Sequence, residues 1–349
     1  MKFTEFPTEG YEKVVHCEDP ESGLSALISV HDTTLGPALG GLRMWPYLSL
    51  QEALTDVNRL SEGMTYKSAV ARTGLGGGKS VIIGNPKTDK SEKLFRAMGR
   101  FVDTFNGTYT TAEDVGTSVE DCVIVRKETK WVTGLPREMG SSGDPPPFTA
   151  RGVFVGQRAC IEKALGTSDF KGVRVAVQGA GHVAQFLCDD LAQAGAEIYI
   201  TDIVKEKAQA LAEKHGATIV APEEIYDVEC EIYAPCALGA TVNDDTIPRL
   251  KCKIVAGGAN NTCLTIEHGD RLRERGILYA PDFVINAGGI INVSVELEPN
   301  GYNEERAMDK TNHIYDAVKD VIEMAEKENT ATNRAAIMLA KQIIAEGKK

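Results

Sequence analysis

Residues 173–202 have the pattern of a strand, a tight glycine turn, a helix and a second strand. An apolar run at 173–177 leads into QGAGHVA at 178–184, and the second strand ends in Thr201 and Asp202. The turn reads G-x-G-x-x-A, with an acid 21 residues after its second glycine. A lone glycine pattern is weak, but this setting predicts a βαβ unit of a doubly wound sheet that binds a dinucleotide.

Each residue type in this unit suits a particular contact. Gly179 makes the tight turn, and Gly181 lets the backbone approach a pyrophosphate at the start of the helix. Asp202 should accept hydrogen bonds from ribose hydroxyls and repel a 2′-phosphate, so we expect NAD as cofactor. Residual NADP use stays open because Lys205 follows nearby. The predicted contacts are Gly179, Ala180, Gly181, His182, Val183, Ala184 and Asp202.

Strands and helices keep alternating after residue 202. Turns rich in glycine or amide side chains follow three strand-like runs, at 235–239, 257–261 and 286–289. The carboxyl ends of parallel strands meet at one edge of a sheet, where doubly wound folds hold their ligand. We therefore expect Ala237, in the first of these turns, to contact the cofactor.

Composition narrows the class of protein. The chain has 349 residues, enough for two domains, and a formal net charge of -12, which argues against nucleic acid or an anionic membrane as a partner. The N-terminus has no apolar signal core. Eight scattered cysteines without a C-x-x-C pair predict free thiols in the cytoplasm, and six scattered histidines predict no metal site. The Gly- and Pro-rich residues 134–147 are the best linker candidate.

The first half of the chain sets two lysines, Lys67 and Lys79, twelve residues apart. Four of the five residues 74–78 are glycine, and the β-branched run 81–83 follows. A phosphate-binding loop is rejected because the first glycine is misplaced and the strand follows the motif instead of preceding it. We expect a glycine-rich turn before the strand, a loop carrying Leu39–Arg43, and a helix over 50–64.

A short strand at 109–111 leads to the acidic pair Glu113 and Asp114. Two interpretations of Asp114 stay open at this point. Its carboxylate can point into a crevice from a strand end, or it can cap the helix that follows.

Eight ordered segments resemble the Glu/Leu/Phe/Val amino-acid dehydrogenase family, and the match is closest to its branched-chain members, the leucine dehydrogenases above all. They cover nearly the whole chain: LGPALGGLRMWP, GMTYKSAVA, GLGGGKSVIIG, TAEDVGT, VQGAGHVA, APCALGA, AGGANN and YAPDFVINAGGIINV. The resemblance implies an α/β fold with a cleft between two domains. Residues 1–135 plus about 330–349 would form the substrate-binding and oligomerisation domain, and 136–329 a Rossmann-type NAD-binding domain.

The resemblance also implies roles for individual residues. Lys67, helped by Gly40, Gly41 and Met64, would bind the substrate α-carboxylate. Lys79 would be the catalytic lysine that activates water, and Asp114 the acid that exchanges protons with the substrate amine. Thr149 and Asn261 would touch the nicotinamide or the substrate. The implied reaction is reversible: an L-amino acid, NAD and water give a 2-oxo acid, ammonia and NADH.

The chemistry requires these residue types independently. A zwitterionic substrate needs a cation for its carboxylate, and its ammonium group must lose a proton to a base before hydride transfer. Hydrolysis of the imine needs a second acid–base group. A partly desolvated lysine beside another lysine, as we expect for Lys79 beside Lys67, has its pKa lowered by both effects.

The resemblance narrows the substrate. Glutamate-specific relatives carry a lysine where this chain has Leu39 and a serine where it has Val293, so an acidic side chain would lack its partners here. An apolar pocket for leucine, valine or isoleucine is expected from Leu39, Ala112, Ile290 and Val293. Phenylalanine is the alternative substrate, because Asn260–Asn261 is closer to the aromatic-acid members.

Two other functions were weighed. A 2-hydroxy-acid dehydrogenase usually needs a His–carboxylate pair, which no motif here offers. A non-catalytic NAD-binding regulator would be favoured by loss of Lys67, Lys79 or Asp114, and all three are present. Family analogy implies a homo-oligomer, commonly an octamer.

Overall fold

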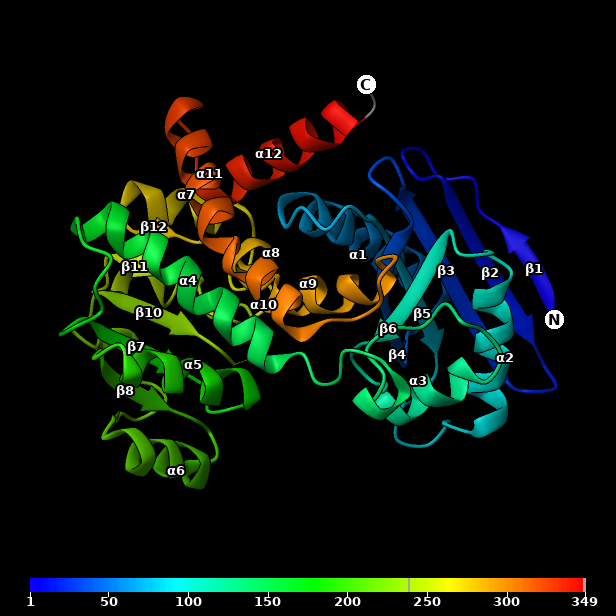
Figure 1. The fold of residues 1–349 in the computed structure, drawn as a ribbon, viewed down its shortest axis with the longest axis horizontal. Helices are drawn as coiled ribbons and strands as arrows, with labels where there is room; N and C mark the ends of the chain where they lie inside the picture. The colour runs from blue at the N-terminus through cyan, green and yellow to red at the C-terminus, as the bar shows by residue number, and fades with distance from the viewer. Residues whose placement is uncertain (238, 348–349) are drawn as a thin grey trace. The chain divides into compact units, whose positions relative to one another are not determined.

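The computed structural model describes residues 1–237 and 239–347, which form two compact units (Figure 1). The first unit comprises residues 1–144, 293–303 and 340–349, and the second comprises 145–292 and 304–339. The packing thus divides the chain at 144/145, and it groups 293–303 with the first unit. The expected turn at 235–239 includes Leu238, which lies outside the described residues. Residues 348–349, the end of the segment 330–349 that was expected to join the first domain, also lie outside them.

The strands and helices alternate along most of the chain. The strands are β1 (Lys2–Glu5), β2 (Lys13–Asp19), β3 (Leu24–Asp32), β4 (Ala38–Trp45), β5 (Gly76–Ile83), β6 (Tyr109–Glu113), β7 (Arg174–Gln178), β8 (Glu197–Thr201), β9 (Thr218–Ile219), β10 (Ile232–Pro235), β11 (Ile254–Val255) and β12 (Leu278–Tyr279). The α-helices are α1 (Leu50–Val70), α2 (Glu92–Asp103), α3 (Val119–Arg126), α4 (Pro146–Leu165), α5 (His182–Gln193), α6 (Lys205–His215), α7 (Glu267–Glu274), α8 (Asp282–Ile285), α9 (Gly288–Ser294), α10 (Glu304–Asn312), α11 (Ile314–Lys327) and α12 (Thr332–Gly347). Short 3₁₀ helices are η1 (Arg137–Met139), η2 (Ile225–Asp227), η3 (Ile247–Arg249) and η4 (Val295–Leu297).

The first unit is built on a mixed sheet with the order β1-β2-β3-β5-β4-β6. The pairs up to β3–β5 are antiparallel, whereas β4 runs parallel to both β5 and β6. Helix α1 packs on one face through Val57 and Ala53 against Leu27 and Val81. Helices α2 and α3 cover the other face with a larger apolar core (Figure 1). The three mutually parallel strands therefore lie at one side of the sheet, with helices on both faces.

Two expectations about local structure were wrong. Leu39–Arg43 is part of strand β4 rather than a loop, and Gly76–Gly78 lie within strand β5 rather than in a turn before it. The reason is close packing: a Cβ at Gly77 would lie 2.5 Å from the Thr65 Cα of α1, and one at Gly78 would lie 2.7 Å from the Tyr109 ring. Gly77 thus leaves room for α1, which runs on past residue 64, to lie directly on β5, and Gly78 leaves room for the Tyr109 ring.

The second unit is built on a parallel sheet with the order β12-β11-β10-β7-β8-β9. The expected strand–turn–helix is present as β7, the glycine turn and α5. The chain leaves β7 at the centre of the sheet, between β10 and β8, so the strand order reverses there. This is the topological switch point at which doubly wound folds bind ligands.

The packing of Gly77 predicts opposite effects of two alanine substitutions. Gly77→Ala forces α1 away from β5 and should lower the unfolding free energy by about 1–3 kcal/mol, as overpacking does. Gly63 lies in α1, and a Cβ at this position would meet no atom within 4 Å. Gly63→Ala should therefore raise the unfolding free energy by about 0.5–1 kcal/mol through helix propensity. Thermal unfolding of both variants checks this. Equal melting temperatures for the two variants would contradict the packing argument.

Candidate active site

The first unit brings most of its predicted site residues together on strands β5, β4 and β6. Gly41 of β4 lies opposite Ala112 of β6, and Leu39 of β4 lies opposite Gly77 of β5. Lys79 lies in β5, and Asp114 is the first residue after β6. Three adjacent strands thus deliver the predicted cation, the predicted acid and the glycine backbone between them.

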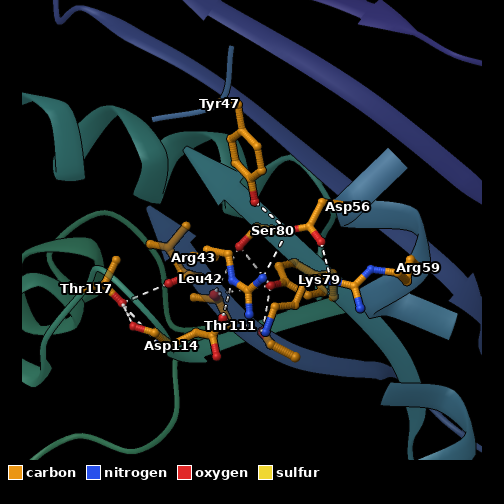
Figure 2. A network of polar contacts seen from close by, with 12 residues as sticks. Leu42, Arg43, Tyr47, Asp56, Arg59, Lys79, Ser80, Thr111, Asp114 and Thr117 are labelled. Carbon is orange, nitrogen blue, oxygen red and sulfur yellow. Dashed lines mark hydrogen bonds and ion pairs between the residues drawn. The ribbon is translucent and has the colours of Figure 1, made fainter. Parts of the chain in front are cut away.

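Lys79 and Asp114 form a buried ion pair (Figure 2). The Lys79 Nζ lies 2.9 Å from Asp114 Oδ2, and the Lys79 side chain is only 6 % exposed. A Cβ at Gly41 would lie 2.7 Å from the Asp114 Cβ and 3.3 Å from the Lys79 Nζ. Glycine at position 41 therefore leaves room for the pair. The alternative that Asp114 caps the next helix is wrong, because Ser118 is the N-cap of α3.

Arg43 is a second cation on the same carboxylate. Its Nε donates a hydrogen bond to Asp114 Oδ2 at 3.1 Å (Figure 2). Burial would raise the pKa of Asp114, but the charges of Lys79 and Arg43 together hold that pKa below its ordinary value. We therefore expect Asp114 to be an ionised carboxylate at neutral pH.

The pKa of Lys79 is lowered from its ordinary value. Burial is the largest cause, Asp114 opposes it, and the positive charge of Arg43 adds to the lowering. A lysine with a depressed pKa can act as a base nearer neutral pH. Arg43 is thus a cation that adds to the effect of burial on Lys79, and the expected effect of Lys67 stays a prediction.

Hydrogen bonds from buried side chains fix the backbone around the pair. The Tyr109 hydroxyl donates to the Gly40 carbonyl at 2.7 Å and can accept from Ser80 Oγ at 2.9 Å. Thr117 Oγ1 donates to the Leu42 carbonyl at 2.8 Å and accepts from the Asp114 amide at 3.1 Å. Sequence reasoning missed these residues. Thr117 ends the segment TAEDVGT, and its position three residues after Asp114 was the available signal.

The other residues of the first unit that were predicted to bind the substrate differ in location and in exposure to solvent. Lys67 lies in the last turn of α1 and is partly exposed, and Met64, one turn earlier, contacts the Gly40 position. Leu39 and Val293 are buried, at 1 % and 7 % exposure. Their roles, and that of the partly exposed Ala112, stay predictions.

The predicted cofactor residues gather at the switch point of the second unit. Gly179 has φ +105°, a conformation that favours glycine, and a Cβ there would lie 3.0 Å from Ala237. The Asp202 carboxylate accepts hydrogen bonds from the amides of Ala180 at 2.7 Å and Val204 at 2.8 Å. The acid therefore lies against the glycine turn, as the spacing predicts.

The start of α5 fits a phosphate group. Its N-cap, Gly181, makes no side-chain cap hydrogen bond, and the space beside the Gly181 Cα is open. Backbone amides at such a helix start can bind an anion. Ala184 is fully buried, and Val183 packs at the Gly258 position. His182, the first residue of α5, is exposed.

The remaining predicted residues of the second unit lie on two further segments. Thr149, in the first turn of α4, is near Gly289 of α9, whose Cβ position is 3.1 Å from the Thr149 Oγ1. Asn261 is exposed with φ +51°, and its carbonyl accepts from the Ala240 amide at 2.6 Å. Ile290 is buried. Each unit thus assembles its own group of predicted residues, and the combined site stays a prediction.

The residues gathered in the two units are those expected of an amino-acid dehydrogenase. Comparison with known proteins identifies the same class of enzyme. Residues 11–131 match the Glu/Leu/Phe/Val dehydrogenase dimerisation domain, and residues 198–349 match the Glutamate/Leucine/Phenylalanine/Valine dehydrogenase domain. The chain belongs to the Glu/Leu/Phe/Val dehydrogenase family. Membership implies a nicotinamide cofactor, and the dimerisation domain indicates an oligomer.

Three relatives show how the similarity is distributed. The chain is 55 % identical to a leucine dehydrogenase of Bacillus cereus, over 96 % of this chain and 91 % of that protein. It is 46 % identical to a phenylalanine dehydrogenase of Bacillus thermotolerans, over 97 % and 90 %. The crystal structure of L-tryptophan dehydrogenase from Nostoc punctiforme superposes with a TM-score of 0.88 at 42 % identity, covering 97 % of each chain. Within residues 1–237 and 239–347, no helix is long and apolar enough to span a bilayer.

The ion pair predicts a pH-dependent cost of Asp114→Asn. Removing the carboxylate leaves Lys79 as an uncompensated buried cation, while Arg43 keeps its ion pair with Asp56. The loss of the Lys79 partner lowers the unfolding free energy by about 3–5 kcal/mol at acid pH. The pKa of Lys79 then falls further, so the unfolded chain binds more protons than the folded one, and stability rises with pH. The melting temperature of the variant should therefore approach that of the wild type as the pH rises toward the ordinary lysine pKa of about 10.

Asp121→Asn is the matched control for this test. Asp121 is also buried, but its partner Lys90 is 31 % exposed and can be solvated when unpaired. We expect a stability loss that does not shrink toward alkaline pH. The same behaviour in both variants would contradict the account of Asp114.

Proposed function

We propose that this protein is an NAD-dependent leucine dehydrogenase that reversibly deaminates leucine, valine and isoleucine to their 2-oxo acids and ammonia. The buried pair of Lys79 and Asp114, beside a glycine backbone, carries this proposal. Leucine dehydrogenases at 52 % to 55 % identity over nearly the whole chain support the substrate class, since the phenylalanine dehydrogenases are at 46 % to 48 %.

The roles of the two charged groups follow from their protonation states. Asp114, an ionised carboxylate, accepts a proton from the substrate ammonium group. A bound nicotinamide would supply the acceptor for the hydride of the α-carbon, and Thr149 and Asn261 are the residues assigned to contact it. Water then adds to the carbon of the resulting iminium, and neutral Lys79 takes a proton from that water. Asp114 returns its proton to nitrogen, the C–N bond breaks with loss of ammonia, and the hydroxyl proton passes to the Asp114 carboxylate as the 2-oxo acid forms.

Substrate orientation is assigned to the residues around this pair. Lys67, on the exposed side of the last turn of α1, binds the α-carboxylate as a point charge, and Met64, Gly40 and Gly41 border it. Leu39, Ala112, Ile290 and Val293 line an apolar pocket in which a second carboxylate would have no counter-charge. Asn261 and Thr149 contact the nicotinamide or the substrate.

The dinucleotide is assigned to the glycine turn of the second unit. The open amides at the start of α5 suit its pyrophosphate, and Asp202 suits the ribose hydroxyls of NAD and repels the 2′-phosphate of NADP. By family analogy the oligomer is an octamer, and the protein acts in the cytoplasm.

Ammonia-dependent oxidation of NADH with a panel of 2-oxo acids tests the proposal. We expect turnover with 4-methyl-2-oxopentanoate and 3-methyl-2-oxobutanoate, and slower turnover with phenylpyruvate. Lys79→Ala should lower turnover by at least about 100-fold, as loss of a general acid–base group does, without weakening NADH binding. Inactivity toward all three acids would refute the proposed function. Turnover of the variant within tenfold of the wild type would refute only the role of Lys79.

Asp202→Ala tests the assigned cofactor. A hydrogen bond to a charged group contributes about 1.5–3 kcal/mol, so the KM for NAD should rise about tenfold or more while the KM for leucine is unchanged. The preference for NAD over NADP should also shrink, because the repulsion of the 2′-phosphate is lost. Glu206→Ala, which removes an exposed acid of α6, is the control and should leave both values unchanged. An unaltered KM for NAD in Asp202→Ala would remove Asp202 from the site.

A further inference from the structure

Arg43 links the proposed catalytic carboxylate to a second, more distant carboxylate. Its Nε donates to Asp114 Oδ2 at 3.1 Å, and its Nη1 donates to Asp56 Oδ2 at 3.0 Å (Figure 2). The Arg43 side chain is 20 % exposed, so the guanidinium lies mostly inside the protein. A planar guanidinium that donates to two carboxylates at once is restricted in both position and rotation.

Asp56 is itself fixed from two further directions. The Tyr47 hydroxyl donates to Asp56 Oδ2 at 2.7 Å, and Arg59 Nη2 donates to Asp56 Oδ1 at 2.6 Å (Figure 2). Asp56 and Arg59 lie on α1, whereas Tyr47 lies in the segment between β4 and α1. The charges therefore alternate in the order Lys79, Asp114, Arg43, Asp56, Arg59, and α1 is the element that anchors them.

We propose that Arg43, held by Asp56, is a positioning residue that orients the Asp114 carboxylate on Lys79 and sets the pH range in which both work. This inference rests on the proposed function and extends it from the reacting groups to the residues that control them. Arg43 does not touch the substrate in this account. It acts through Asp114 at 3.1 Å and through its charge on Lys79.

The charges around Lys79 and Asp114 predict the direction in which each pKa changes when Arg43 or Asp56 is replaced. Lys79 is influenced by Asp114, Arg43 and Asp56, and the positive charge of Arg43 lowers its pKa, after burial, while Asp56 raises it. Asp114 is influenced by Lys79 and Arg43, which lower its pKa against burial. The pKa values of Glu113 and Tyr109 are raised chiefly by burial, and the Asp114 charge adds to the rise of both. Lys67 of α1 is the further charged group assigned to the site. Loss of Arg43 therefore raises the pKa of both Asp114 and Lys79, whereas loss of the Asp56 charge lowers that of Lys79.

The test compares Arg43→Met with Asp56→Asn through the pH dependence of kcat/KM for leucine. Both proposed bases need to be deprotonated, so the acid limb of Arg43→Met should move to higher pH by about one unit, a tenfold change in proton affinity. The acid limb of Asp56→Asn should move to lower pH. Arg43→Met should also lower kcat more than it raises KM, because the orientation of Asp114 is lost.

Two further variants separate this role from a structural one. Arg43→Lys keeps the charge but not the two-way geometry, so its acid limb should stay near that of the wild type while kcat falls. Lys90→Gln removes a comparable ion pair, with Asp121, outside the site and should change neither quantity. If Arg43→Met does not fold, two other variants still decide: the acid limb of Arg43→Lys should stay in place while its kcat falls, and the acid limb of Asp56→Asn should move to lower pH. Acid limbs that coincide with the wild type in Arg43→Met and Asp56→Asn, or that move in the same direction, would overturn the proposal.

A second measurement does not depend on enzymatic activity. The rate at which acetic anhydride acetylates Lys79, followed by mass spectrometry of its peptide across a pH series, reports the pKa of that lysine directly. The midpoint should be higher in Arg43→Met than in the wild type and lower in Asp56→Asn. An inactive wild type that still shows these shifts would refute the proposed function and support the role of Arg43. An active wild type with unshifted midpoints would do the reverse.

Discussion

The contact between the Lys79 ammonium and the Asp114 carboxylate is the interaction around which the candidate site of the first unit is built. Taking two charges out of water is costly, and the cost is recovered only with close geometry and further hydrogen bonds. The structure supplies both: the pair is 2.9 Å apart, and Arg43 donates to the same carboxylate oxygen. Glycine at position 41 provides the space, because a side chain there would collide with Asp114.

Asp114 and Lys79, which lie next to each other, both have lowered pKa values, but for different reasons. The cations hold Asp114 ionised, and burial with Arg43 moves Lys79 toward neutrality. A carboxylate and a lysine poised in this way can each move a proton in one reaction. The second unit has a separate task, since its glycine turn and Asp202 lie where a parallel sheet reverses its strand order.

Much of this could be predicted from sequence because the decisive signals are local. The glycine turn at 179–184 lies between a strand and a helix, and its acid follows at a set distance, so fold and residues come from one short stretch. The dehydrogenase family could be recognised from eight ordered segments. Strand β5 was less accessible: consecutive glycines normally indicate a turn, and only their contacts with Thr65 and Tyr109 explain a glycine-rich buried strand. Arg43, Asp56 and Thr117 were missed as site residues because their roles arise from β4, α1 and a later loop meeting in space.

A crystal structure with NADH and 4-methyl-2-oxopentanoate, without ammonia, tests the central claim most directly. The account predicts that the 2-oxo oxygen lies within hydrogen-bond distance of the Lys79 Nζ and that the 2-oxo carbon lies about 3–3.5 Å from the Asp114 carboxylate. The substrate carboxylate should lie on Lys67 and the pyrophosphate at the start of α5. A 2-oxo acid bound away from Lys79 and Asp114, or an intact Lys79–Asp114 pair that excludes it, would contradict the account.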